Sequence, residues 1–290
     1  MKISKQNKKV WAGVLVAVAG MVMGTSASAQ WSPADLSSLA AWFDADDAAT
    51  VLTDGSSVTN WLDKSGNDNH ATQASGTAQP MTGRTFTNTT LNVLDFDGTD
   101  DRLGLPSLGL TDGAIVFAVF EVDDTEDNRY TVVASGKDGL DTYLGTATPH
   151  VFLSPSRLDG ISAGMPTTGA HFYSKSALVS GDSYQYYVDG SLTPTADGST
   201  SGKTFDGNKL IFIGGTGEGN FTADPRFHLD GAIGEVIVLD ERPDYTTRQK
   251  VEGYLAWKWG LVDLLPTDHD WKDEDPGAAP ATPGTLIYGK

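Results

Sequence analysis

Apolar and polar residues alternate in short blocks along most of this chain. From residue 31 onward, runs rich in Val, Ile, Phe and Tyr are separated by clusters of Gly, Asp, Asn, Ser and Thr. This pattern is typical of antiparallel strands, because each strand needs apolar side chains and each reversal needs turn-forming residues. The clearest predicted strands span residues 91–96, 114–122, 130–134, 184–188, 209–213 and 233–239.

Asp-Gly pairs adjoin four of the apolar runs. Such a pair supplies the positive φ angles that tight hairpins require. The four pairs are Asp97-Gly98, Asp189-Gly190, Asp206-Gly207 and Asp230-Gly231. Repeated hairpin signals of one kind predict a meandering antiparallel sandwich.

One segment, 244–261, has a helical period instead. Val251, Leu255, Trp259 and Val262 recur at spacings of four, four and three, which places them on one helix face. Asp244 is the predicted N-cap, and Gly260 marks the C-terminal end. We expect one amphipathic helix whose tryptophans cover one end of the sandwich.

The first 29 residues have the features of a secretory signal peptide. Lysines precede an apolar run over 10–23, and small residues at 27–29 form a cleavage site after Ala29. The run is shorter than the ~20 residues of a membrane span. We therefore expect cleavage, no membrane span in the mature form, and secretion to the extracellular space or cell surface, with the periplasm as an alternative. Retention of the segment as an anchor is the other possibility.

The C-terminal segment, 273–290, is acidic and then rich in Pro, Gly and Ala, which predicts a flexible tail. Between the two ends, residues 30–272 are expected to form one domain, since 39% apolar residues, seven Trp and eleven Phe suffice for one large core.

Composition excludes several kinds of chemistry. The absence of Cys rules out disulfides, thiolate zinc sites and cysteine nucleophiles. The five His show no paired spacing that would suggest zinc. A formal charge of −18 repels nucleic acid and acidic membrane surfaces at long range, so neither is an expected partner.

Five ordered motifs, at 39–47, 61–71, 94–101, 230–238 and 249–261, together resemble the laminin-G-like, concanavalin A-like jelly-roll domains of bacterial exported proteins. The resemblance implies an all-β fold, an antiparallel two-sheet jelly-roll sandwich with one C-terminal amphipathic helix. It also implies carbohydrate or protein binding at a cell surface, often with a structural calcium ion, although a fold alone does not fix a function.

Two loops offer oxygen ligands of the kind that Ca²⁺ prefers, at 63–69 and 97–101. We expect a structural calcium ion with ligands among Asp63, Asn67, Asp97 and Asp100. The alternative is that these Asp and Asn residues only form tight turns.

The leading functional hypothesis is a non-enzymatic, lectin-like domain that binds a glycan or a glycan-bearing surface. Its expected ligand-binding residues are Asn67, Asn69, His70, Asp101 and Arg102, with Tyr143 or Trp61 stacking on a sugar ring. The alternative is a structural or adhesive component of the cell envelope or an extracellular assembly, in contact with other envelope proteins through its sheet edges.

A glycoside hydrolase is the least favoured alternative. The string over 121–126 places Glu121 and Glu126 in a Glu-x-Asp-x-x-Glu pattern found in glycan-cleaving enzymes of this fold. Asp124 and Thr125 interrupt it with polar residues, so we expect the strand to end near Val122 and the remaining acids to lie in a loop. A solvated loop would not hold two carboxyl groups at the ~5–5.5 Å separation that a retaining mechanism needs.

Overall fold

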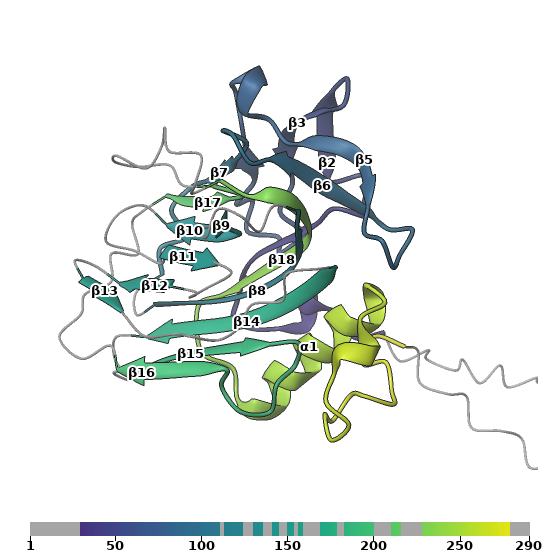
Figure 1. The fold of residues 1–290 in the computed structure, drawn as a ribbon, viewed down its shortest axis with the longest axis vertical. Coiled ribbons are helices and arrows are strands. Elements are labelled where there is room, and N and C mark those ends of the chain that lie inside the picture. The colour runs from purple at the N-terminus through teal and green to yellow at the C-terminus, as the bar shows by residue number, and fades with distance from the viewer. Residues whose placement is uncertain are drawn as a thin grey trace, which may run out of the picture. The chain divides into compact units, whose positions relative to one another are not determined.

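The described residues fold into antiparallel β-strands with one α-helix (Figure 1). The computed structural model describes residues 30–110, 113–123, 130–135, 141–144, 150–153, 156–158, 169–178, 183–199, 210–215 and 228–278. The strands are β1 (Leu39–Asp44), β2 (Val51–Asp54), β3 (Ser57–Trp61), β4 (Ala71–Thr72), β5 (Met81–Thr85), β6 (Asn92–Asp97), β7 (Leu103–Leu105), β8 (Gly113–Val122), β9 (Tyr130–Thr131), β10 (Val133–Ser135), β11 (Asp141–Leu144), β12 (His150–Leu153), β13 (Ser156–Leu158), β14 (Ala170–Leu178), β15 (Ser183–Val188), β16 (Ala196–Ser199), β17 (Ile211–Ile213) and β18 (Asp230–Leu239). The helix is α1 (Tyr245–Lys258), and short 3₁₀ turns lie at η1 (Pro33–Asp35), η2 (Gly76–Ala78) and η5 (Val262–Leu264).

The strands form one large hydrogen-bonded sheet and a second small one. The large sheet runs in the order β10-β17-β7-β4-β3-β5-β6-β18-β8-β14-β15-β16, with β1 paired to β18 and β2 to β3. The small sheet has the order β13-β12-β11-β9. All of these pairings are antiparallel.

Both faces of the central strands are buried, which makes the architecture a sandwich with a helical cover. In β8, Val116 and Phe120 belong to one core, whereas Phe117 and Val119 belong to another. Alternation of side chains along a strand produces this division. The first core also contains apolar side chains of β7 and β17, so two parts of the large sheet face each other across it. The second core contains the buried face of α1. The predicted all-β sandwich with one helix is confirmed.

The helix begins and packs as its sequence predicts. The carboxylate of Asp244 accepts a hydrogen bond from the backbone N–H of Thr247 at 2.7 Å, which caps α1. Val251, Leu255 and Trp259 have no exposed surface and lie in the second core. The predicted range extended beyond Lys258 because Val262 continues the apolar period, but Val262 belongs to the separate turn η5.

The strand predictions are confirmed within a few residues, except that the predicted strand over 130–134 is divided into β9 and β10, which belong to different sheets. Asp189 and Gly190 both have positive φ, as a tight hairpin requires. Two hairpin predictions are wrong. Asp97-Gly98 leads from β6 to β7, which do not pair with each other. Asp230-Gly231 instead begins β18. Glycine is required there because a Cβ on Gly231 would lie 2.1 Å from the carbonyl oxygen of Glu121 on the adjacent β8. The pair Asp206-Gly207 lies outside the described residues.

The predicted signal peptide, 1–29, and residues 279–290 of the predicted tail also lie outside the described residues. In the part of the chain that the structure describes, no helix has the length and apolar character needed to cross a membrane.

Candidate functional site

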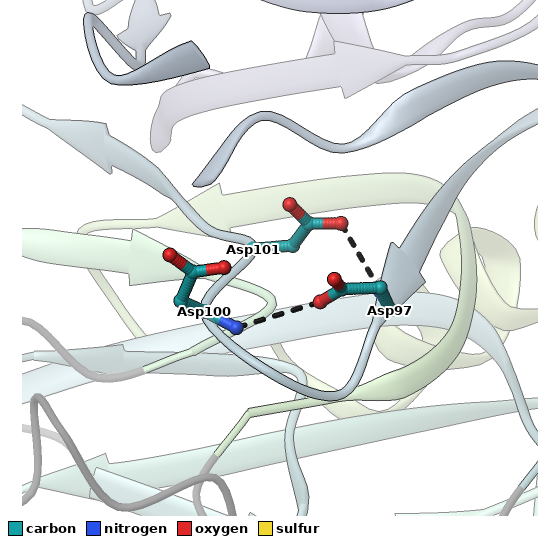
Figure 2. Close-up of side chains that lie close together, drawn as sticks. All are labelled: Asp97, Asp100 and Asp101. Carbon is teal, nitrogen blue, oxygen red and sulfur yellow. Dashed lines mark hydrogen bonds between the residues drawn. The ribbon is translucent and has the colours of Figure 1, made fainter. Parts of the chain in front are cut away.

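Three carboxylates converge in the loop between β6 and β7. One oxygen each of Asp97, Asp100 and Asp101 lies within 4.8 Å of the others (Figure 2). The loop folds this way because the Asp97 carboxylate accepts hydrogen bonds from the backbone N–H groups of Thr99, at 2.8 Å, and Asp100, at 3.4 Å. The Asp101 carboxylate in turn accepts one from the backbone N–H of Asp97 at 3.0 Å. We call these three residues the acidic cluster.

The acidic cluster is electrostatically unfavourable without a counter-charge. Burial, followed by the negative charges of Asp97 and Asp100, raises the pKa of Asp101 to about 7. Three carboxylates could supply part of the six to eight oxygens of a calcium ion, with backbone carbonyls and water as the remainder. The cluster contains two expected calcium ligands, Asp97 and Asp100, together with Asp101, which was expected to bind a glycan.

The other expected ligands lie in the loop over 62–70, where they join the loop to β1. Both oxygens of Asp63 accept backbone hydrogen bonds, from Trp42 at 2.8 Å and from Asn69 at 3.0 Å. The amide groups of Asn67 and Asn69 both donate to the carbonyl of Ala40, at 3.2 and 2.9 Å. These contacts use the Asp63 carboxylate and the amide nitrogens of Asn67 and Asn69, so the residues help to hold the 62–70 loop on β1.

The three remaining residues of the expected binding set have separate positions. His70 accepts a hydrogen bond from the backbone N–H of Asp63 through Nδ1, at 3.1 Å. Arg102 donates to the carbonyl of Asp100 at 3.5 Å, beside the acidic cluster. Tyr143 lies in β11, and its side chain is outside the described residues. Trp61, the alternative stacking residue, has no exposed surface and packs against Phe43 in the first core.

An aromatic and charged hollow was not predicted from the sequence. A cavity of about 450 Å³ is lined by Trp31, Trp42, Asp44, Lys64, Tyr254 and Lys258, among others. We call it the tryptophan cavity. Its walls come from the segment before β1, β1 itself, the 62–70 loop, α1 and the C-terminal residues Asp275 and Gly277, so distant parts of the sequence assemble it.

A buried ion network forms one side of the tryptophan cavity. The Glu235 carboxylate of β18 has no exposed surface and accepts hydrogen bonds from Trp42 Nε1 at 2.7 Å and Trp259 Nε1 at 2.8 Å. It also accepts from Tyr254 Oη at 3.0 Å and from Lys258 Nζ at 2.8 Å. Burial raises the pKa of the Glu235 carboxyl, and the nearby Lys258 ammonium opposes this shift.

Two lysines connect this network to β1. Lys258 lies 2.7 Å from Asp44, and Lys64 lies 2.8 Å from both Asp44 and Asp47. Burial alone would lower the pKa of Lys64, but hydrogen bonds to the two carboxylates raise it. Four of the five sequence motifs named above therefore contribute residues to this network, namely 39–47, 61–71, 230–238 and 249–261. Their charged residues hold β1, the 62–70 loop, β18 and α1 together.

The sequence contained one overlooked signal of this network. Glu235 interrupts an apolar run that predicts a buried strand, and a buried carboxylate requires hydrogen-bond donors and a counter-charge. These groups are supplied by Trp42, Tyr254 and Lys258. All three belong to the sequence motifs named above, but only the tertiary fold brings them together.

As expected, β8 ends at Val122, within the acidic string over 121–126. Residues 124–126 of this string lie outside the described residues. Glu121 is 7% exposed, and burial raises the pKa of its carboxyl, although the charge of Arg84 opposes this. Its Oε2 lies 3.8 Å from Arg84, which also pairs with Asp95 and Asp123. Glu126 lies outside the described residues.

The described residues therefore form an antiparallel β-sandwich that contains the tryptophan cavity and the acidic cluster. No family model and no curated protein matches the chain. Among solved structures, the chain is similar to Trypanosoma rangeli sialidase in complex with sialic acid, with a TM-score of 0.51 and 12% identity over 77% of this chain and 33% of that chain. It thus spans about a third of the length of that sialidase. A domain of a Geobacillus stearothermophilus GH43 arabinanase, in complex with arabinotriose, aligns with a TM-score of 0.48 and 13% identity over 72% of this chain and 95% of that domain.

At this level of identity the sialidase resemblance shows the fold alone. It agrees with the antiparallel β-sandwich that the sequence predicts.

Proposed function

We propose that this protein is an exported, non-enzymatic domain of the laminin-G-like type that binds a glycan at a cell surface or in the extracellular space. The observation that supports this proposal best is the tryptophan cavity. It combines aromatic rings with charged hydrogen-bonding groups in one hollow of about 450 Å³, within the size range of small-ligand sites.

The cavity chemistry suits a sugar ring. The Trp31 and Tyr254 rings meet edge to face at 5.8 Å, which offers apolar surface for the C–H face of a sugar. Carboxylate and ammonium groups of Asp44, Lys64 and Lys258 can bond to hydroxyl groups at the same wall. A lysine ammonium lies over each tryptophan ring, with Lys64 Nζ 4.5 Å from the Trp42 centroid and Lys250 Nζ 4.8 Å from the Trp31 centroid. A sugar would therefore stack on the ring surface that the ammonium leaves open.

We also propose that the acidic cluster binds calcium. A divalent cation would offset the burial and the carboxylate repulsion that together raise the pKa of Asp101, and it would fix the turn between β6 and β7. Its role would be structural, because no lining residue of the tryptophan cavity belongs to the cluster.

A glycan array tests the function. The mature protein from Gln30 onward is screened with calcium and again with chelator, beside Trp31→Ala and a control, Trp257→Ala, whose ring does not line the cavity. Selective binding that Trp31→Ala lowers at least tenfold, and the control preserves, supports the proposal. Absence of binding in all conditions contradicts it and favours the structural or adhesive alternative.

Enzyme activity is tested separately. We expect no release of reducing sugar from the glycans that bind. Release that Glu121→Gln abolishes would overturn the non-enzymatic assignment and restore the glycoside hydrolase alternative.

A further inference from the structure

A second hollow lies between the sheet and the start of α1. Its volume is about 220 Å³, and its polar walls are Ser174 and Ser176 of β14, Tyr187 of β15, and Arg242, Tyr245 and Arg248 at or near α1. Ile115 and Phe117 of β8 add apolar surface. We call it the arginine cavity. It shares no lining residue with the tryptophan cavity, so its role is independent of the function proposed above.

Arg248 is held rigidly in this cavity. Its guanidinium carbon lies 3.8 Å from the centroid of the Tyr187 ring and 5.3 Å from that of Tyr245. Nη1 donates to both carboxylate oxygens of Glu252 at 2.7 Å. A guanidinium fixed in this way is preorganised for an incoming group, because its side-chain conformation is already set by stacking and by the ion pair.

Two buried polar atoms of the cavity walls have unmet hydrogen-bonding capacity. Within the described residues, Nη2 of Arg248 and Oγ of Ser176 have no hydrogen-bond partner, although their residues are only 7% and 6% exposed. Buried donors are normally satisfied, so atoms of this kind call for an explanation. Both atoms are fully buried, so a ligand that accepts from Nη2 and pairs with the Ser176 hydroxyl would satisfy both after a small shift of the cavity wall.

The charge of the cavity favours an anion. Among the described lining residues none is acidic, whereas Lys175, Arg242 and Arg248 are cationic. Two carboxylates lie close by, and each offsets one positive charge: Glu252 pairs with Arg248, and Asp244 caps α1. The three lining cations therefore still outnumber the nearby carboxylates. In a chain with a formal charge of −18, such a cationic hollow is a local exception.

We propose that the arginine cavity binds a single acidic sugar residue, such as a uronic acid, with its carboxylate on Arg248 and a hydroxyl on Ser176. Guanidinium groups match carboxylates in geometry as well as charge. The tyrosine rings and the apolar wall can cover the ring of the sugar. Because the strong negative charge of the chain repels polyanions at long range, a lone or terminal acidic residue fits better than an extended acidic polymer.

Isothermal titration of the full chain tests this proposal with four probes: glucuronate, glucose, acetate and inorganic phosphate. We expect glucuronate to bind at least tenfold more tightly than each of the others. Equal binding of glucose would remove the role of the carboxylate. Equal binding of acetate or phosphate would reduce the cavity to a simple anion site and overturn the sugar assignment.

Variants locate the binding. Arg248→Lys retains the charge but loses the planar donor geometry, and Ser176→Ala removes one hydroxyl with little change in shape. We expect Arg248→Lys to weaken glucuronate binding by about tenfold and Ser176→Ala by about threefold. The control is Arg84→Lys, at an arginine that pairs with Asp95 and Asp123, and it should leave glucuronate binding unchanged. Unchanged binding in folded Ser176→Ala and Arg248→Lys would overturn the proposed position. Trp31→Ala should lower glycan binding in the tryptophan cavity without altering glucuronate affinity, so the two proposals can fail separately.

Discussion

Lys258 Nζ lies 2.8 Å from Oε2 of Glu235, and this ion pair joins α1 to β18 where the carboxylate has no exposed surface. The same ammonium lies 2.7 Å from Asp44 of β1, so one lysine connects three elements. A buried carboxylate that loses its counter-charge is strongly destabilising, whereas replacing both partners of such a pair is often better tolerated.

Lys258→Met is therefore expected to lower the free energy of unfolding by about 3–5 kcal/mol, because Glu235 and Asp44 lose their shared cation. Denaturant unfolding measures this loss. The control is Lys250→Met, on the same helix, whose ammonium lies over the Trp31 ring at 4.8 Å and whose loss should cost about 1 kcal/mol or less.

The double variant Lys258→Met/Glu235→Gln distinguishes this explanation from a simple loss of packing. We expect it to be more stable than Lys258→Met alone, since the uncompensated carboxylate is removed with its partner. Additive losses, or equal losses in Lys258→Met and Lys250→Met, would contradict the role assigned to the ion pair.

A second prediction concerns pH. The pKa of Asp101 in the folded protein is about 7, against an ordinary value of 3.8, so the folded state binds more protons between these two values. In chelator, the contribution of Asp101 to the free energy of unfolding should therefore be largest below about pH 4. This contribution should fall as the pH rises toward 7. The expected loss is on the order of 2 kcal/mol after allowance for solvent screening.

Thermal unfolding between pH 4 and 8 measures this dependence, with and without calcium. Asp101→Asn should flatten the profile in chelator, while Asp68→Asn, at an exposed turn residue with positive φ, should leave it unchanged. Added calcium should raise the melting temperature of the unaltered protein most strongly near pH 8, where the cluster is ionised. If calcium has no effect at any pH, the proposed calcium site is wrong.

Local sequence patterns were sufficient to predict the six strand segments named from the apolar runs, together with the helix and its cap, whereas other described strands such as β1 and β14 were not specified. Each depends on residues near one another in the chain, such as Asp244 and the apolar positions that follow it. The clustering of Asp97 with Asp100 is likewise a property of one loop. The tryptophan cavity could not be predicted in this way, because Trp42 and Tyr254 meet only through the pairing of β1 with β18 and the packing of α1.

The same distinction applies to Asn69. Its residue type and turn context suggested a ligand-binding amide, but in the fold its Nδ2 donates to the carbonyl of Ala40 on β1 at 2.9 Å. Whether the amide serves the fold or a ligand can be decided by one substitution. Asn69→Ala is expected to lower the free energy of unfolding by about 1 kcal/mol, the usual net contribution of one such hydrogen bond, and to leave the affinity for any glycan found on the array unchanged.

Urea unfolding and glycan titration of the same samples provide the two measurements. The matched control is Asn92→Ala, whose exposed amide donates to Asp46 at 3.3 Å and should contribute less than about 0.5 kcal/mol. A loss of glycan affinity in Asn69→Ala without a loss of stability would reverse the conclusion and return Asn69 to the binding site. A loss of stability with affinity retained would mean that Asn69 serves the fold, by holding the 62–70 loop on β1, and does not contact the sugar.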